Sequence, residues 1–249
     1  GLIGSDVEGK ILSEQLDQRN IVYTNLVESD NRPTTVKSRI MAQNQQVVRA
    51  DREVNEDLSD SSNQKLADAI RSTINDIDGL ILEDYNKGVL NVNSIPEIIG
   101  LANKAGKPIY VDPKESNFNM YKYVRLFKPN LSEFQNAYSE KDSLEVAGFK
   151  LKNDLNAEIL MITRSADGVS LFDGSDYHHI PTKARHVHDV SGAGDTVIST
   201  FTLSDLCGAL PKESVALSNY AAGRVCEEVG VVPITLEMLN EMVDHHNSI

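Results

Sequence analysis

Short apolar runs alternate with stretches of helical periodicity from about Ile77 onward. The apolar runs predict buried strands at 79–82, 107–111, 124–127 and 158–163, and the stretches between them predict helices at 92–105, 132–138 and 143–155. This alternation is typical of βαβ units on a mostly parallel sheet. The predicted strands end in polar corners that often contain proline. Because ligands bind beyond the carboxyl ends of strands in open parallel sheets, we expect chemistry at these corners.

The first part of the chain has a different pattern. Residues 34–42 and 47–50 alternate polar with apolar positions and predict an antiparallel ribbon at about 33–51. Such a ribbon could be a small lid on an α/β domain or a simple edge hairpin. Periodicity also predicts helices at 6–19 and 63–74, the second of them after a polar loop. Gly1-Leu-Ile-Gly4 reads as the end of a strand, so we expect further residues before Gly1 in the native protein.

Composition fits a folded protein, and we interpret residues 1–249 as a single domain. Acidic residues outnumber basic ones by 37 to 24, and the net charge of -13 argues against non-specific binding to nucleic acid or anionic membranes. No apolar run approaches the ~18 residues of a membrane span. Cys207 and Cys226 have no metal-ligand spacing and predict reduced thiols. We therefore expect a soluble, cytoplasmic protein.

The sharpest local signal is Asp189-Val-Ser-Gly-Ala-Gly-Asp195, directly before a helical run at 196–206. Gly192 and Gly194 permit unusual backbone angles and close approach to a ligand. The N–H groups of 192–194 would face out of a helix N-terminus, where the helix dipole favours an anion. A carboxylate at Asp195 beside such an anion hole suits phosphoryl transfer, since it could accept the proton of an attacking hydroxyl. A tight helix entry with a favourable acidic first turn is the alternative interpretation.

Several common chemistries have no signature here. The sequence lacks a P-loop, the protein-kinase motifs, a dinucleotide-binding glycine fingerprint and a nucleophile elbow. The histidines at 178, 179, 186 and 188 cluster without the spacing of zinc ligands, so we interpret them as strand and loop residues.

The segment 189–195 resembles the carboxy-terminal signature of the ribokinase-like (PfkB) carbohydrate kinases. Asn130-Leu-Ser-Glu133 resembles the Asn-x-x-Glu element of that family, and Asn219-Tyr-Ala-Ala-Gly223 resembles the helix that flanks its adenine pocket. A larger set of segments resembles the D-glycero-β-D-manno-heptose 7-phosphate kinases, which act in ADP-heptose synthesis for lipopolysaccharide cores. These segments are Arg32-Pro-Thr-Thr, Asn44-Gln-Gln46, Asp84-Tyr85 with Lys87-Gly88, Asp112-Pro-Lys114 and Thr163-Arg-Ser165.

The resemblance implies a three-layer α/β ribokinase-like fold with a β-ribbon lid, and phosphate transfer from MgATP to the anomeric hydroxyl of a heptose 7-phosphate. It implies that Asp195 is the catalytic base, that Gly192, Ala193 and Gly194 form the anion hole, and that Asn130 and Glu133 act on the ATP phosphates and on Mg²⁺, Glu133 through water. It also implies nucleotide contacts from Thr163, Arg164, Ser165, Gly168, Asn219 and Gly223. Ser165 stands where the broader family usually has glycine. A serine at that position puts a phosphate contact through its backbone in doubt. An alternative role for Asn130-Leu-Ser-Glu133 is a helix start, with Ser132 as the cap.

For the sugar phosphate, the implied residues are Lys114, Asp84, Lys87, Asn44, Gln45 and Gln46, with Lys37 or Arg39 as further cations on the ribbon. Asp189 and Ser191 match positions that help to bind a monovalent cation in some relatives. Contact between two lids could form a homodimer. Two alternatives remain open: another sugar or nucleoside kinase of the same fold, and a catalytically silent protein that binds nucleotide or sugar as a regulator.

Overall fold

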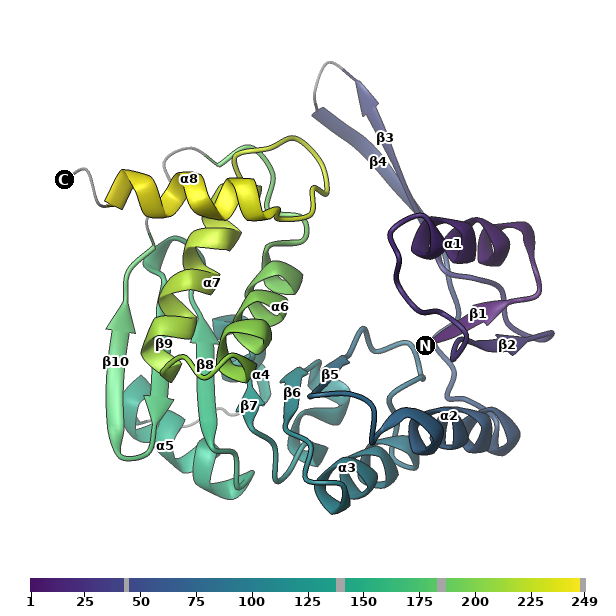
Figure 1. The fold of residues 1–249 in the computed structure, drawn as a ribbon, viewed down its shortest axis with the longest axis horizontal. Coiled ribbons are helices and arrows are strands. Elements are labelled where there is room, and N and C mark those ends of the chain that lie inside the picture. Colours follow the sequence, from purple (N-terminus) through teal and green to yellow (C-terminus); the bar gives the residue numbers. More distant parts are fainter. Residues whose placement is uncertain (43–44, 138–141, 183–186, 247–249) are drawn as a thin grey trace. The chain divides into compact units, whose positions relative to one another are not determined.

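The computed structural model describes residues 1–42, 45–137, 142–182 and 187–246. It forms two compact units (Figure 1). Unit 1 comprises Gly1–Asp76 and Asp84–Leu101, and unit 2 comprises Ile77–Glu83 and Ala102–Ile249. The interpretation of the chain as one domain therefore stays a prediction.

Unit 1 contains two separate pairs of strands and two helices of its own. The strands β1 and β2 pair in parallel, and β3 and β4 form the predicted antiparallel ribbon, with a register shift between Ile40 and Met41. Helix α2 begins before the predicted residue 63 because Ser59 caps it by accepting a hydrogen bond from the Ser62 N–H. The bounds are β1 (Leu2–Gly4), α1 (Val7–Asp17), β2 (Val27–Ser29), β3 (Val36–Ala42), β4 (Gln45–Arg52) and α2 (Asp60–Thr73), and α3 (Ser94–Lys104) continues from unit 1 into unit 2.

Unit 2 is built on a six-stranded sheet in the order β10-β9-β8-β7-β6-β5. The four strands from β5 to β8 are parallel, and β9 and β10 form an antiparallel edge. The strands are β5 (Leu80–Glu83), β6 (Ile109–Asp112), β7 (Leu126–Phe127), β8 (Ile159–Thr163), β9 (Val169–Asp173) and β10 (Asp176–Ile180). The helices are η1 (Glu115–Met120), α4 (Leu131–Ala137), α5 (Leu144–Asp154), η2 (Ser165–Asp167), α6 (Ala193–Leu206), α7 (Pro211–Val225) and α8 (Leu236–His246).

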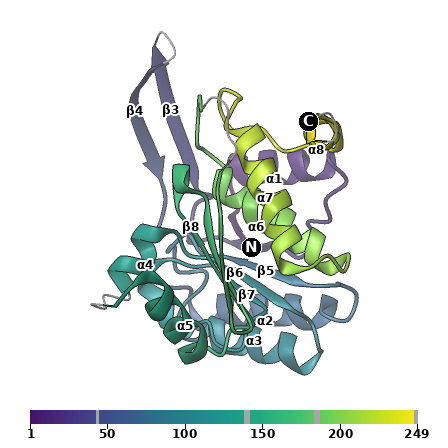
Figure 2. The ribbon, with the colours of Figure 1, turned by 90° about the vertical axis from the view of Figure 1, so that its left-hand side faces the viewer.

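Helices cover both faces of this sheet, so unit 2 has three layers (Figure 2). Helices α6 and α7 pack on one face, where Phe201 and Val215 join Tyr110 and Met161 in the buried core. Helix α5 packs against β8 and β9 on the other face. The predicted mostly parallel α/β sheet is confirmed, although β7 is shorter than the predicted strand at 124–127. Among the described residues, no helix combines the length and the apolar character that a membrane crossing requires.

Candidate active site

The turn before α6 brings a carboxylate to the start of that helix. The Asp189 carboxylate accepts a hydrogen bond from the Ser191 N–H at 2.9 Å, and the Ala193 N–H donates to the Val190 carbonyl at 3.2 Å. Gly192 caps the helix with a φ of 81°, a left-handed conformation that suits glycine. The helix therefore begins at Ala193, three residues before the predicted run at 196–206.

Asp195 lies in the first turn of α6 and is exposed to solvent. Ala193 and Gly194, two residues of the predicted anion hole, lie in the first turn of α6. Ala193 donates its N–H within the turn, because the chain reverses tightly there. Gly194 belongs to the helix and is not among the glycines with positive φ, so its place does not require left-handed freedom. The N-terminal end of α6 still favours negative charge beside Asp195.

A cluster of acidic residues and one lysine surrounds this turn. Carboxylate oxygens of Glu83, Asp112 and Asp195 lie within 4.8 Å of one another. Lys128 already supplies a cation there, since its Nζ lies 2.7 Å from Asp112 Oδ2 while its side chain is only 3% exposed. A Cβ built on Gly194 would lie 3.6 Å from that Asp112 oxygen and 3.7 Å from Lys128 Nζ, so this ion pair borders the helix start.

Sequence reasoning did not predict that Glu83 and Lys128 border this site. Both follow apolar runs at the carboxyl ends of parallel strands, and that position was the signal that could have found them. Burial raises the pKa of Glu83 to about 9, and the nearby Asp112 and Asp195 add to the rise. Burial and the two neighbouring carboxylates thus favour the neutral form of Glu83.

Asn130 and Glu133 hold each other at the start of α4. The Glu133 N–H donates to Asn130 Oδ1 at 2.8 Å, and Glu133 Oε2 accepts from the Asn130 N–H at 2.9 Å. This reciprocal pair is a capping box, so Asn130 caps the helix and not Ser132. Glu133 Oε1 bonds to Lys114 Nζ. Burial alone would lower the pKa of Lys114, but the hydrogen bond to Glu133 and the charge of Asp112 raise it above its usual value.

The residues predicted to contact nucleotide line the end of β8 and the turn after it. Thr163 pairs with Asn130 across the sheet edge. The Arg164 N–H donates to the Gly168 carbonyl at 2.7 Å and closes the turn, while the Arg164 guanidinium reaches Ser170 Oγ at 3.4 Å. Ser165 has a φ of 52°, so this serine does adopt the left-handed conformation for which the family usually supplies glycine.

Two further predicted nucleotide residues lie on α7. The Asn219 amide donates to the Pro181 carbonyl at 3.0 Å and accepts from Thr182 Oγ1 at 3.1 Å, so it anchors the segment after β10. Gly168 meets the same segment: it has a φ of 83°, and a Cβ there would overlap the Ile180 carbonyl oxygen. Gly223 lies in the last turns of α7.

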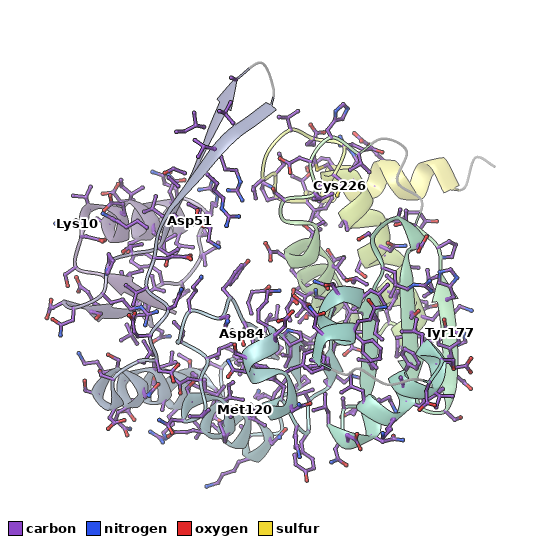
Figure 3. The ribbon with its side chains drawn as sticks, turned by 180° about the vertical axis from the view of Figure 1, so that it is seen from behind. Lys10, Asp51, Asp84, Met120, Tyr177 and Cys226 are labelled. Carbon is purple, nitrogen blue, oxygen red and sulfur yellow. The ribbon has the colours of Figure 1, made fainter. Side chains whose placement is uncertain are left out.

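Most of the residues predicted for the sugar phosphate belong to unit 1. Asp84 is 2% exposed, and its Oδ1 accepts from the Asn86 N–H at 2.7 Å (Figure 3). Lys87 Nζ bonds to Glu53 at 2.6 Å and to Asn55 at 2.9 Å. On the ribbon, Lys37 Nζ lies 5.0 Å from the centre of the Tyr85 ring, and Arg39 is directly opposite Arg49. Asn44 lies outside the described residues, and Gln45 and Gln46 are the first two residues of β4.

Known proteins resemble this chain over nearly its whole length. The pfkB family of carbohydrate kinases matches residues 1–237. The bifunctional protein HldE of Helicobacter pylori strain G27 is 38% identical over 241 residues, which are 95% of this chain and 52% of that protein. The bifunctional protein HldE of a Nitratiruptor species is 38% identical over 244 residues, which are 96% of this chain and 51% of that protein. The chain thus spans about half the length of these curated relatives.

Solved structures identify the fold. Phosphofructokinase-2 from Escherichia coli in complex with potassium matches with a TM-score of 0.81 and 16% identity, over 99% of this chain and 81% of that one. A ribokinase from Thermotoga maritima matches with a TM-score of 0.76 and 21% identity, over 98% of this chain and 80% of that one. These likenesses confirm the predicted ribokinase-like fold. Together with the family match over residues 1–237, they lead to one conclusion: this chain belongs to the pfkB family of carbohydrate kinases.

Proposed function

We propose that this protein transfers the γ-phosphate of MgATP to the anomeric hydroxyl of D-glycero-D-manno-heptose 7-phosphate, giving the 1,7-bisphosphate. The observation that carries the proposal is the exposed Asp195 carboxylate in the first turn of α6, three residues after the left-handed cap Gly192. Membership of a carbohydrate kinase family supports the reaction class. The choice of acceptor rests on the segments that resemble heptose 7-phosphate kinases and on the HldE relatives.

Asp195 is the base in this proposal. It accepts the proton of the attacking hydroxyl while the oxygen forms its bond to the γ-phosphorus and ADP leaves. The start of α6, with the backbone of Gly192 and Gly194, favours the negative charge on the transferred group. The proton thus ends on Asp195, and no covalent intermediate with the protein is needed.

Asn130 and Glu133 are the residues that would act on magnesium and the ATP phosphates. Their donor set fits Mg²⁺, which prefers carboxylate and amide oxygens and keeps several waters. Both Glu133 oxygens already have partners, the Asn130 N–H and Lys114 Nζ, so a role through bound water fits better than direct ligation. When bound with ATP, magnesium would neutralise charge on the phosphates. Thr163, Arg164, Ser165, Gly168, Asn219 and Gly223 stay the predicted nucleotide contacts.

Lys114 remains the main candidate for the acceptor phosphate, with Lys87, Asp84, Asn44, Gln45 and Gln46 as the other predicted contacts. Lys114 would have to exchange its partner Glu133 for the substrate, and its side chain is 36% exposed and long enough to turn. Lys87 would likewise exchange Glu53 and Asn55.

Two further parts of the proposal concern a cation and a second copy of the chain. The Ser191 N–H donates a hydrogen bond to the Asp189 carboxylate and folds this loop back on itself, and we propose the loop as the monovalent-cation site. The structure of phosphofructokinase-2 from Escherichia coli in complex with potassium, which shares the fold, suggests a monovalent cation but does not indicate which residues bind it. Ile40, Val47 and Val48 are exposed on the ribbon, which supports a homodimer through this surface.

The experiment that tests the function is ADP release by the purified protein with four acceptors: heptose 7-phosphate, fructose 6-phosphate, ribose and adenosine. Turnover with the heptose alone is the expected result. Turnover with a different acceptor would retain the kinase mechanism and refute the heptose assignment. Measurable ATP binding without turnover on any of the four would instead favour a nucleotide-binding regulator.

A further inference from the structure

Glu83 and Asp112 are neighbours by the register of the sheet. They end the adjacent parallel strands β5 and β6, where Glu83 is directly paired with Asp112. Carboxylate oxygens of the two residues lie within 4.8 Å of each other. Two ionised carboxylates this close repel each other, and a proton on one of them removes that repulsion.

The lysine decides which of the two is protonated. Asp112 is 6% exposed and Lys128 is 2% exposed, and their ion pair measures 2.7 Å. A buried ammonium needs an ionised partner, so Asp112 keeps its charge and Glu83 carries the proton. The charged groups that face Glu83 are Asp112 on β6, Lys128 after β7, Asp195 on α6 and, farther away, Lys114 after β6. The raised pKa of Glu83 agrees with this assignment.

We propose that Glu83 is a positioning residue of the reaction: as a neutral acid that donates to Asp112, it keeps the cluster around Asp195 at one net negative charge. This inference rests on the proposed function of Asp195 as the base. Asp112 is balanced by Lys128, so an ionised Glu83 would bring a second negative charge beside Asp195. That charge would repel the phosphates of ATP.

The test compares Glu83→Gln with a matched change, Glu145→Gln, on the exposed first turn of α5. Glutamine keeps a donor for Asp112 and cannot ionise. We expect Glu83→Gln to keep kcat at pH 7 within about threefold of the wild type. Wild-type kcat should fall as the pH rises through about 9, and this alkaline fall should be absent in Glu83→Gln and retained in Glu145→Gln.

Two results would overturn the inference. A loss of about 100-fold in kcat at pH 7 for Glu83→Gln would mean that the ionised form of Glu83 is required, as a base or a cation ligand. Identical pH profiles in the wild type and Glu83→Gln would mean that Glu83 does not influence Asp195.

A readout without turnover separates this inference from the proposed function. In protein labelled with ¹³C at the glutamate side-chain carboxyl, we expect one resonance that titrates above pH 7 in the wild type and is absent from Glu83→Gln. If that resonance appears but no acceptor is phosphorylated, the proposed function fails and the protonated Glu83 stands. If every glutamate titrates below pH 6, the inference fails whatever the acceptor assay shows.

Discussion

Asp205 joins the end of α6 to the edge of the sheet where the parallel strands begin. Its carboxylate accepts two hydrogen bonds from Arg125, at 2.7 and 3.0 Å, and one from the Tyr110 hydroxyl at 2.7 Å. The Asp205 side chain is 6% exposed and that of Arg125 is 27% exposed. Arg125 also bonds to Glu158 at 2.7 Å, but the Glu158 side chain is 65% exposed.

We predict that Asp205→Ala lowers the free energy of unfolding by about 2–4 kcal/mol. Breaking a fully buried ion pair costs about 3–5 kcal/mol, because the remaining charge loses its partner. The partial exposure of Arg125 reduces this penalty. The hydroxyl of Tyr110, a residue that is 0% exposed, also loses its acceptor, and this adds to the loss of stability. At roughly 2–4 °C per kcal/mol, a loss of about 3 kcal/mol lowers Tm by about 6–12 °C.

Thermal and urea denaturation measure this effect, with Glu158→Gln as the control that removes only the exposed partner. The control should change stability by less than about 0.5 kcal/mol. Burial would raise the pKa of Asp205, but the hydrogen bonds from Arg125 and Tyr110 hold it below its usual 3.8. The stabilisation is therefore full at neutral pH. It is lost only as the pH falls below the usual 3.8 and through the lower folded pKa, so the difference in stability between the wild type and Asp205→Ala should shrink in that acid range. An Asp205→Ala protein as stable as Glu158→Gln at pH 7 would refute this reasoning.

Three further predictions test the turns and caps around the site by urea denaturation. Ser165→Gly should raise the free energy of unfolding by about 0.5–1 kcal/mol, because the φ of 52° is strained for serine; a loss of stability would contradict this. Gly168→Ala should lower the free energy of unfolding by more than about 2 kcal/mol, because the new Cβ would overlap the Ile180 carbonyl oxygen. The control Gly174→Ala has a φ of 55° and open space around it, so it should cost about 1 kcal/mol. Equal losses in the two variants would argue against the steric explanation. Asn130→Ala should lower stability by about 1 kcal/mol and Asn130→Asp by much less, since aspartate can still cap α4; similar losses in both would rule out the capping role.

The sequence pattern predicts the parallel sheet and its reactive edge because both depend on local rules. Apolar runs separated by helical periods indicate strands such as β6 and β8, and the polar residues after them fall at one edge since the strands are parallel. The left-handed turn at Gly192 and the acid at Asp195 are likewise encoded within seven residues.

The rest of the site depends on contacts between strands that periodicity does not specify. Glu83 meets Asp112 only through the register of β5 and β6, and Lys128 meets Asp112 only because β7 is the neighbour of β6. The same limit applies to Lys114 and Glu133, which lie 19 residues apart and form an ion pair. The role of Asn130 as a cap was missed because Ser132 offers an equally good cap in the sequence.

The most direct test of Asp195 as the base is the turnover of Asp195→Asn with ATP and heptose 7-phosphate, followed by ³¹P NMR of the product. Asparagine keeps the size of the side chain and removes its ability to accept the proton. We predict that kcat falls by about 10²–10⁴-fold while the Kd for ATP changes by less than about threefold, and that the wild type forms a phosphate at the anomeric carbon. Near-normal turnover by Asp195→Asn would contradict the mechanism proposed for this site.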